Sequence, residues 1–172
     1  IGGDLNISTQ TDLGGSVYVK GNFNQQWGGY LYMNKGRLEI EGDYNAAADT
    51  RYTELRMQNA GDYICVHGNM NFHPYYSTSL TAGTIEVGGD LTSSKNLTAT
   101  GSHRFLFSGD KRQQINIATS CYFATIELQN YSEEAVYATN IFNKSKLIRN
   151  GCRLTYEGQS GELGWTLTED TV

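Results

Sequence analysis

The segment Gly83-Thr-Ile-Glu-Val-Gly-Gly-Asp-Leu91 contains the pattern that decides the fold. Apolar and polar residues alternate up to a glycine, and an acidic residue follows that glycine. Such alternation is typical of a short β-strand that buries one face. Glycine adopts backbone conformations closed to other residues, and aspartate bonds to nearby backbone amides in turns. The segment therefore predicts a strand that ends in a corner.

The same pattern recurs along the chain at a nearly constant period. The copies are Ile1–Leu5 (truncated), Gly15–Phe23, Gly36–Tyr44, Ile64–Met70 and Phe105–Lys111. The key glycines, at positions 3, 21, 42, 68, 89 and 109, are 18, 21, 26, 21 and 20 residues apart. A second, shorter apolar pair such as Leu31 and Met33 precedes each copy. Repeats of this length, without a helical stretch between them, indicate a solenoid.

We therefore predict an all-β chain folded as a parallel β-helix, or β-solenoid, with about eight coils of about 21 residues. One coil cannot bury its own inner row, whereas coils stacked about 4.8 Å apart can. A β-sandwich is the alternative, because it also has short strands and regular turns. The solenoid is favoured because residue types recur at a fixed phase. The expected inward rows are Val17, Val19, Leu38, Ile40, Ile64, Val66, Ile85, Val87, Phe105 and Phe107.

The regularity of the repeat divides the chain within one domain. Residues 1–111 are expected to form the regular coils. Residues 112–172 are expected to form less regular coils and a C-terminal cap or a junction to a following module. The chain begins at Ile1 without a methionine, which we interpret as a piece of a longer protein.

Composition excludes several classes of protein. The aromatic share of 12% is too high for a disordered linker. The net charge of −5, without a basic block, predicts no nucleic-acid partner. No apolar run approaches the roughly 20 residues that cross a bilayer, so no membrane insertion is expected. Cys65, Cys121 and Cys152 form neither a disulfide framework nor a zinc motif, and the sequence leaves open whether two of them pair.

Exposed aromatic residues are the candidates for ligand binding. Trp27, Tyr30, Tyr75 and Tyr76 fall in expected loops, and Tyr18 and Tyr32 have outward parity. Aromatic faces stack on sugar rings while polar neighbours orient the hydroxyl groups. The alternative interpretation is that these side chains cover the corners of the coils.

The repeated acids are the second set of candidates. In register, Asp43, Asn69, Asp90 and Asp110 would line one edge, with neighbouring carboxylates roughly 5 Å apart. That spacing suits calcium or the carboxylate pair of a glycosidase. A catalytic residue should occur once, whereas a turn residue should recur. Because these acids and amides recur in every copy, we expect them to be turn or ladder residues. Asp43, Asp90 and Asp110 are kept as the calcium candidates.

No other pattern predicts catalysis or a cofactor. The sequence contains no nucleophile elbow, phosphate-binding loop, zinc-protease motif or dinucleotide fingerprint. His67, His73 and His103 do not cluster with other metal ligands in sequence, and we expect them at the surface.

The chain resembles tandem repeat modules of large secreted or surface proteins of Firmicutes. The resemblance covers nearly the whole chain. The segments that carry it are Ile1–Leu5, Leu80–Leu91, Ala99–Asp110 and Gly164–Val172. It implies an extracellular setting, secreted or at the cell surface, with neighbouring modules of the same parent chain as partners. It supplies no catalytic residues.

These observations predict a non-catalytic structural or adhesive module that acts as a stalk or adhesion scaffold, with glycans or a host or cell-surface protein as further partners. The alternative is a carbohydrate-binding module attached to an enzyme. A polysaccharide-degrading β-helix enzyme is the third hypothesis.

Overall fold

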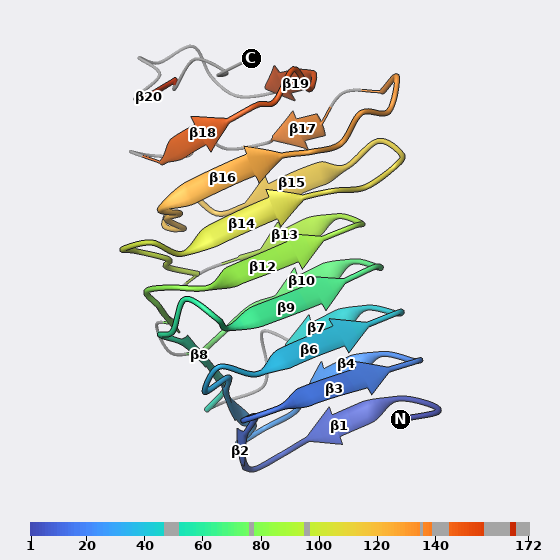
Figure 1. Ribbon diagram of the computed structural model, residues 1–172, viewed down its shortest axis with the longest axis vertical. Coiled ribbons are helices and arrows are strands. Elements are labelled where there is room, and N and C mark those ends of the chain that lie inside the picture. Colours follow the sequence, from blue (N-terminus) through green and yellow to red (C-terminus); the bar gives the residue numbers. More distant parts are fainter. Residues whose placement is uncertain are drawn as a thin grey trace.

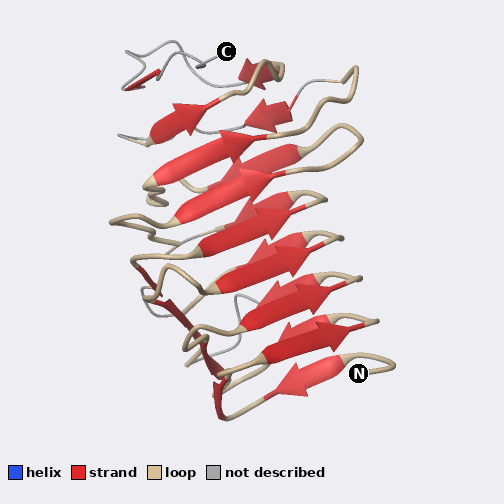
Figure 2. Cartoon of the chain, viewed as in Figure 1, coloured by secondary structure: helices blue, strands red, loops and turns tan. Residues whose placement is uncertain are grey.

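The computed structural model describes residues 1–46, 52–75, 78–94, 97–134, 136–138, 145–156 and 166–167. In this part of the chain every regular element is a β-strand, and every pairing between strands is parallel. The coils stack on one another along a single axis (Figures 1 and 2). The predicted β-solenoid is therefore confirmed, and the β-sandwich alternative is wrong because it requires antiparallel sheets. None of the described residues forms a helix of the length and hydrophobicity needed to cross a membrane.

Within the described ranges, three parallel sheets form the sides of the solenoid. Sheet A has eight strands, in the order β1 (Leu5–Ile7), β4 (Phe23–Gln25), β7 (Tyr44–Ala46), β10 (Met70–Phe72), β13 (Leu91–Ser93), β15 (Gln114–Ile117), β17 (Val136–Ala138) and β19 (Leu154–Tyr156). Sheet B has four, in the order β2 (Gln10–Asp12), β5 (Tyr30–Tyr32), β8 (Glu54–Met57) and β11 (Ser79–Leu80). Sheet C has eight, in the order β3 (Ser16–Val19), β6 (Arg37–Ile40), β9 (Tyr63–Val66), β12 (Thr84–Val87), β14 (Arg104–Phe107), β16 (Thr125–Leu128), β18 (Lys146–Ile148) and β20 (Thr166–Leu167).

The chain passes through sheets A, B and C once in each coil. Coils 1 to 4 contain β1–β3, β4–β6, β7–β9 and β10–β12. In coils 5 and 6, single bridges at Ala99 and Tyr122 take the place of a sheet B strand. The described residues thus form about six complete turns, fewer than the eight expected. Strands β17 to β20 extend sheets A and C beyond them, and their connections lie outside the described residues.

The inward residues form continuous columns along the axis. Ile40, Val66 and Val87 are paired in register across β6, β9 and β12, and all three are fully buried. Nine of the ten predicted inward residues are buried; Val17, in the first coil, is only partly buried. Each fully buried side chain of this size contributes about 1.5–3 kcal/mol. The apolar column therefore stabilises coils that could not fold singly.

Glycine is required where sheet C turns into sheet A, because successive coils touch there through their backbones. A Cβ atom on Gly89 would lie 2.6 Å from the carbonyl oxygen of Gly68, and one on Gly42 would lie 2.8 Å from that of Gly21. Backbone hydrogen bonds join the same pairs, with Gly89 N donating to Gly68 O over 2.8 Å. Any side chain here would separate the coils.

The residue after each glycine forms a ladder between coils. The side-chain Oδ1 of Asp4, Asn22, Asp43, Asn69 and Asp90 accepts a hydrogen bond from the backbone N–H at the same position of the next coil, over 2.7–2.9 Å. These residues are the Asx ladder. The predicted turn or ladder role is therefore observed. Asp and Asn alternate along the ladder, so that neighbouring rungs are never both carboxylates.

The expectation that Asp110 continues this row is wrong. The N–H that bonds to Asp90 Oδ1 belongs to Gln114, because β13 pairs with β15 through Leu91 and Ile115. Gln113 therefore occupies the place of a corner glycine. Its buried amide donates to the carbonyls of Val87 and Gly89 and accepts the N–H of Gly109. Asp110 lies in the extra residues of this corner and is exposed.

Val87→Asp is expected to abolish soluble expression or to unfold the chain. The change places a carboxylate in the fully buried apolar column, which costs several kcal/mol of folding free energy. Circular dichroism and thermal melting of the purified chain measure the effect. The matched control is Thr92→Asp, which adds the same charge at an outward position of β13. A Val87→Asp chain that melts like the control would contradict the buried column.

Candidate functional site

Trp27, the most exposed of the candidates that the structure describes, lies at the apex of a tight turn between β4 and β5. Gly29 N donates to Gln26 O over 2.8 Å, and Gly28 follows Trp27 with a φ of 77°. This is the geometry of a type II turn, which requires glycine at its third position. A Cβ on Gly28 would also lie 2.9 Å from the carbonyl oxygen of Ser8 in coil 1. The local sequence therefore holds Trp27 outward, with 66% of it exposed.

A buried glutamine anchors this turn from inside. Gln25 is 1% exposed, and its Nε2 donates to Gly29 O over 2.7 Å and to Glu54 O in coil 3 over 2.6 Å. Its Oε1 accepts the hydroxyl of buried Tyr44 over 2.8 Å. Fully bonded buried amides rigidify their surroundings. The turn that carries Trp27 is thus tied to coil 3.

Tyr30 and Tyr32 continue from Trp27 along β5, on the outward face of sheet B. Leu31 between them is buried, so both tyrosines point away from the core and are half-buried. Their rings meet edge to face at 6.5 Å. The guanidinium of Arg56 lies 4.2 Å from the centre of the Tyr32 ring. Trp27, Tyr30 and Tyr32 are called the aromatic strip below.

Tyr75 lies in coil 4, after β10. Its ring is 6.0 Å from that of Tyr52 in coil 3, and each residue is 41% exposed. Tyr76 lies outside the described residues. Sequence reasoning missed Tyr52 and Arg56, because their approach to Tyr75 and Tyr32 depends on the pairing of different coils.

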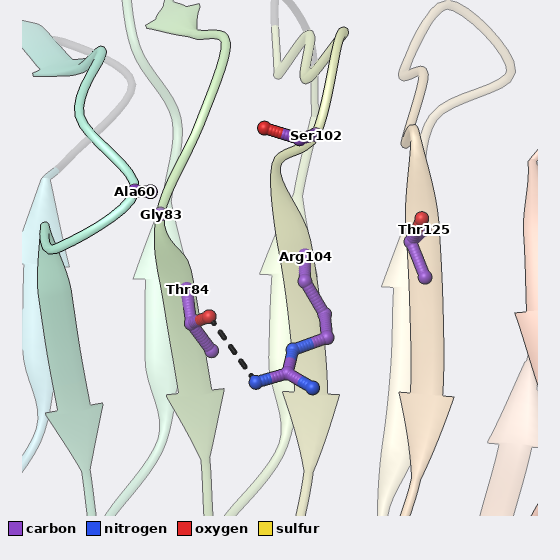
Figure 3. A pocket seen from close by; sticks show the side chains of 6 residues that line it. All are labelled: Ala60, Gly83, Thr84, Ser102, Arg104 and Thr125. Atoms are coloured by element: carbon purple, nitrogen blue, oxygen red, sulfur yellow. Dashed lines mark hydrogen bonds between the residues drawn. The ribbon is translucent and has the colours of Figure 1, made fainter.

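A shallow groove of about 340 Å³ lies where sheet C begins (Figure 3). Its lining residues are Ala60, Gly83, Thr84, Ser102, Arg104 and Thr125. Arg104 donates to the Glu127 carboxylate over 2.8 Å and to the Thr84 hydroxyl over 3.4 Å. This lining offers hydrogen bonds but no carboxylate, thiol or imidazole. It can orient a polar ligand, and it contains no group suited to general acid–base chemistry near neutral pH.

Cys65, His67 and Glu39 come together on the outer face of sheet C. His67 Nε2 is 3.9 Å from Cys65 Sγ and 3.3 Å from Glu39 Oε1. In a Cys–His–acid triad the thiol and the acid meet different ring nitrogens, whereas here both meet the same one. Burial and the carboxylates of Glu86 and Glu39 raise the pKa of the Cys65 thiol to about 11. The thiol is therefore protonated at neutral pH and is a poor nucleophile.

The calcium candidates separate in the structure. Asp43 and Asp90 lie two coils apart in the Asx ladder, with Asn69 between them, and Asp110 lies outside the ladder. Within the described part of the chain, no three His, Cys, Asp or Glu side chains are placed to hold a metal ion together. Cys65, Cys121 and Cys152 are all buried, and Cys65 and Cys121 do not pair in a disulfide.

The expectation of a surface position is wrong for His103. The side chain is fully buried against Phe105, with ring centres 5.1 Å apart. Neither ring nitrogen has a hydrogen-bond partner. Burial lowers the pKa of His103 to about 3, although the Asp62 carboxylate acts in the opposite direction. His103 is therefore neutral in the folded chain.

Comparison of the chain with known protein families, with curated proteins and with solved structures finds no match. The repeat therefore rests on the sequence, and the solenoid architecture rests on the structure.

His103 makes the stability of the fold depend on pH. Between about pH 3 and the ordinary histidine pKa of about 6.5, the unfolded chain binds a proton that the folded chain does not. The free energy of unfolding therefore falls as the pH is lowered, by about 2 kcal/mol between pH 7 and pH 5. Urea melts at several pH values measure the slope of the free energy of unfolding against pH for the wild type and for His103→Phe. The variant is expected to lose most of this slope.

Phe123→Leu, which alters the same buried aromatic cluster around Phe105 without removing a titratable group, is the control for this prediction and is expected to keep the slope. Equal slopes for His103→Phe and the wild type would show that His103 is not the group responsible.

Proposed function

We propose that the chain is a non-catalytic structural or adhesive repeat module of a large secreted or cell-surface bacterial protein. In this role it acts as a stalk or an adhesion scaffold. The observation that carries the proposal is the Asx ladder together with the buried column, because both repeat the same interaction from coil to coil along one axis. Interactions that repeat in this way make the molecule long and stiff.

The strand pairing supports a load-bearing role. Backbone hydrogen bonds between coils run along the axis in all three sheets. Separating two coils requires that these bonds break together with an Asx rung such as that from Asp90 N to Asn69 Oδ1. Bonds loaded in parallel share the applied force, so an array of this form resists extension along its axis.

Neighbouring modules of the same parent chain are the proposed partners. Leu5, Leu13 and Val17 in coil 1 are only partly buried, whereas the equivalent side chains of the inner coils are fully buried. An uncovered end of a solenoid exposes strand edges and apolar side chains, and capping repeats normally cover it. A preceding module of the same architecture would bury these side chains. The resemblance to secreted Firmicutes modules supports the extracellular setting.

Two observations favour a non-catalytic role over an enzyme. The groove at Arg104 is lined by hydroxyl groups and one guanidinium that is already paired with Glu127. The thiol of Cys65 is protonated at neutral pH. The aromatic strip favours glycan binding as an additional role.

Removing two rungs of the Asx ladder is expected to weaken the module against extension. The double variant Asn22→Ala/Asn69→Ala loses the acceptors for the amides of Asp43 and Asp90. About 1 kcal/mol is lost for each rung. Force spectroscopy, with the chain pulled from both ends, is expected to give a lower rupture force for the variant than for the wild type.

Thr92→Ala, a truncation on the outward face of β13, is the control and is expected to keep the rupture force of the wild type. A wild-type chain that extends without a rupture event would overturn the scaffold role.

A further inference from the structure

The rigid turn between β4 and β5 carries an exposed tryptophan, Trp27. Trp27 exposes 66% of its surface, whereas Phe23 in the same coil and Tyr44 in the next coil are almost fully or fully buried. Its turn is fixed by Gly28 and by the fully bonded amide of buried Gln25. Exposed aromatic surface on a preorganised turn suits ligand binding, because little conformational entropy is lost when a ligand binds.

Polar residues flank the aromatic strip on both neighbouring coils. In β2, Gln10 and Asp12 pair with Tyr30 and Tyr32, and both are exposed. In β8, Glu54 and Arg56 pair with the same two tyrosines from the other side. Arg56 bonds to Glu54 over 3.1 Å and covers the Tyr32 ring, which restrains all three side chains. Figure 1 shows β2 and β8 on one side of the solenoid.

This chemistry fits carbohydrate. Aromatic rings stack on the C–H faces of pyranose rings, and carboxylate, amide and guanidinium groups bond to the hydroxyls between them. Asp12 and Glu54 place negative charge on both sides of the strip, in a chain whose net charge is −5, which disfavours polyanions such as polyuronates. The four strands of sheet B extend about 14 Å along the axis, so the face spans more than one sugar unit.

We propose that the aromatic strip and its flanking residues form a binding site for a neutral linear polysaccharide. Trp27 supplies the stacking surface. Tyr30 and Tyr32 extend that surface along β5, and the side chains of β2 and β8 bond to hydroxyl groups of adjacent sugar units. Such a site would attach the scaffold to a glycan matrix. The aromatic strip that forms it is separate from the Asx ladder and the buried column, which support the scaffold role.

Affinity gel electrophoresis tests the site. The purified chain is run in gels that contain a neutral polysaccharide: hydroxyethylcellulose, xylan, galactomannan or a soluble β-1,3-glucan. A gel with polygalacturonate tests binding to an anionic polysaccharide. Retardation is expected in at least one of the neutral gels and not in polygalacturonate. Titration calorimetry with the retarding polysaccharide then gives the affinity of each variant.

Trp27→Ala is expected to weaken binding about tenfold or more, and Trp27→Phe to restore part of it. The matched control is Tyr131→Ala, which removes an aromatic side chain that is 71% exposed in a distant corner. Because both residues are exposed, both variants are expected to melt like the wild type.

Three results would overturn the proposal: no retardation in any neutral gel, preferred retardation in polygalacturonate, or equal weakening by Trp27→Ala and Tyr131→Ala. Each of them leaves the scaffold role intact, because that role is judged by the rupture force of chains without ligand.

Discussion

The direct contact between the backbones of successive coils, where sheet C turns into sheet A, is the constraint on which the structure depends. Gly21, Gly42, Gly68 and Gly89 allow this contact because they lack a Cβ atom. Once the backbones touch, the residue after each glycine is close enough to accept an amide N–H of the next coil. The register of the sheets and of the buried column follows from this corner. Where Gln113 takes the glycine's place, its own amide supplies the bonds.

The composition of the Asx ladder reduces the electrostatic cost of stacking. Identical residues in a parallel solenoid lie one strand spacing apart, about 4.8 Å, and carboxylates at that distance repel one another. Because asparagine occupies every second rung from Asp4 to Asp90, the carboxylates lie about 10 Å apart. Asparagine and aspartate both accept the backbone N–H through Oδ1, over 2.7–2.9 Å, so the alternation preserves the hydrogen bonds while it separates the charges.

The sequence predicts those features that depend on one coil at a time. Alternation identifies inward residues such as Ile85, and glycine with aspartate or asparagine identifies the corners. Features that depend on two coils are harder to predict. The extra residues around Asp110 shift the ladder to Gln114, although a Gly-Asp pair is present. The burial of His103 and the approach of Arg56 to Tyr32 follow from the register, which the irregular spacing of the glycines conceals.

Parallel register also determines how the length of this protein can change during evolution. Each inner coil offers the same hydrogen bonds and the same apolar column to the coil on either side. Duplication or loss of a whole coil therefore preserves the parallel register and the apolar column, although a change by one coil places two like rungs of the Asx ladder next to each other. Loss of one residue within a strand such as β12 would exchange the inward and outward side chains beyond it. Mutation can thus lengthen or shorten the chain readily in units of one coil, whereas single-residue insertions are tolerated at corners such as that around Asp110.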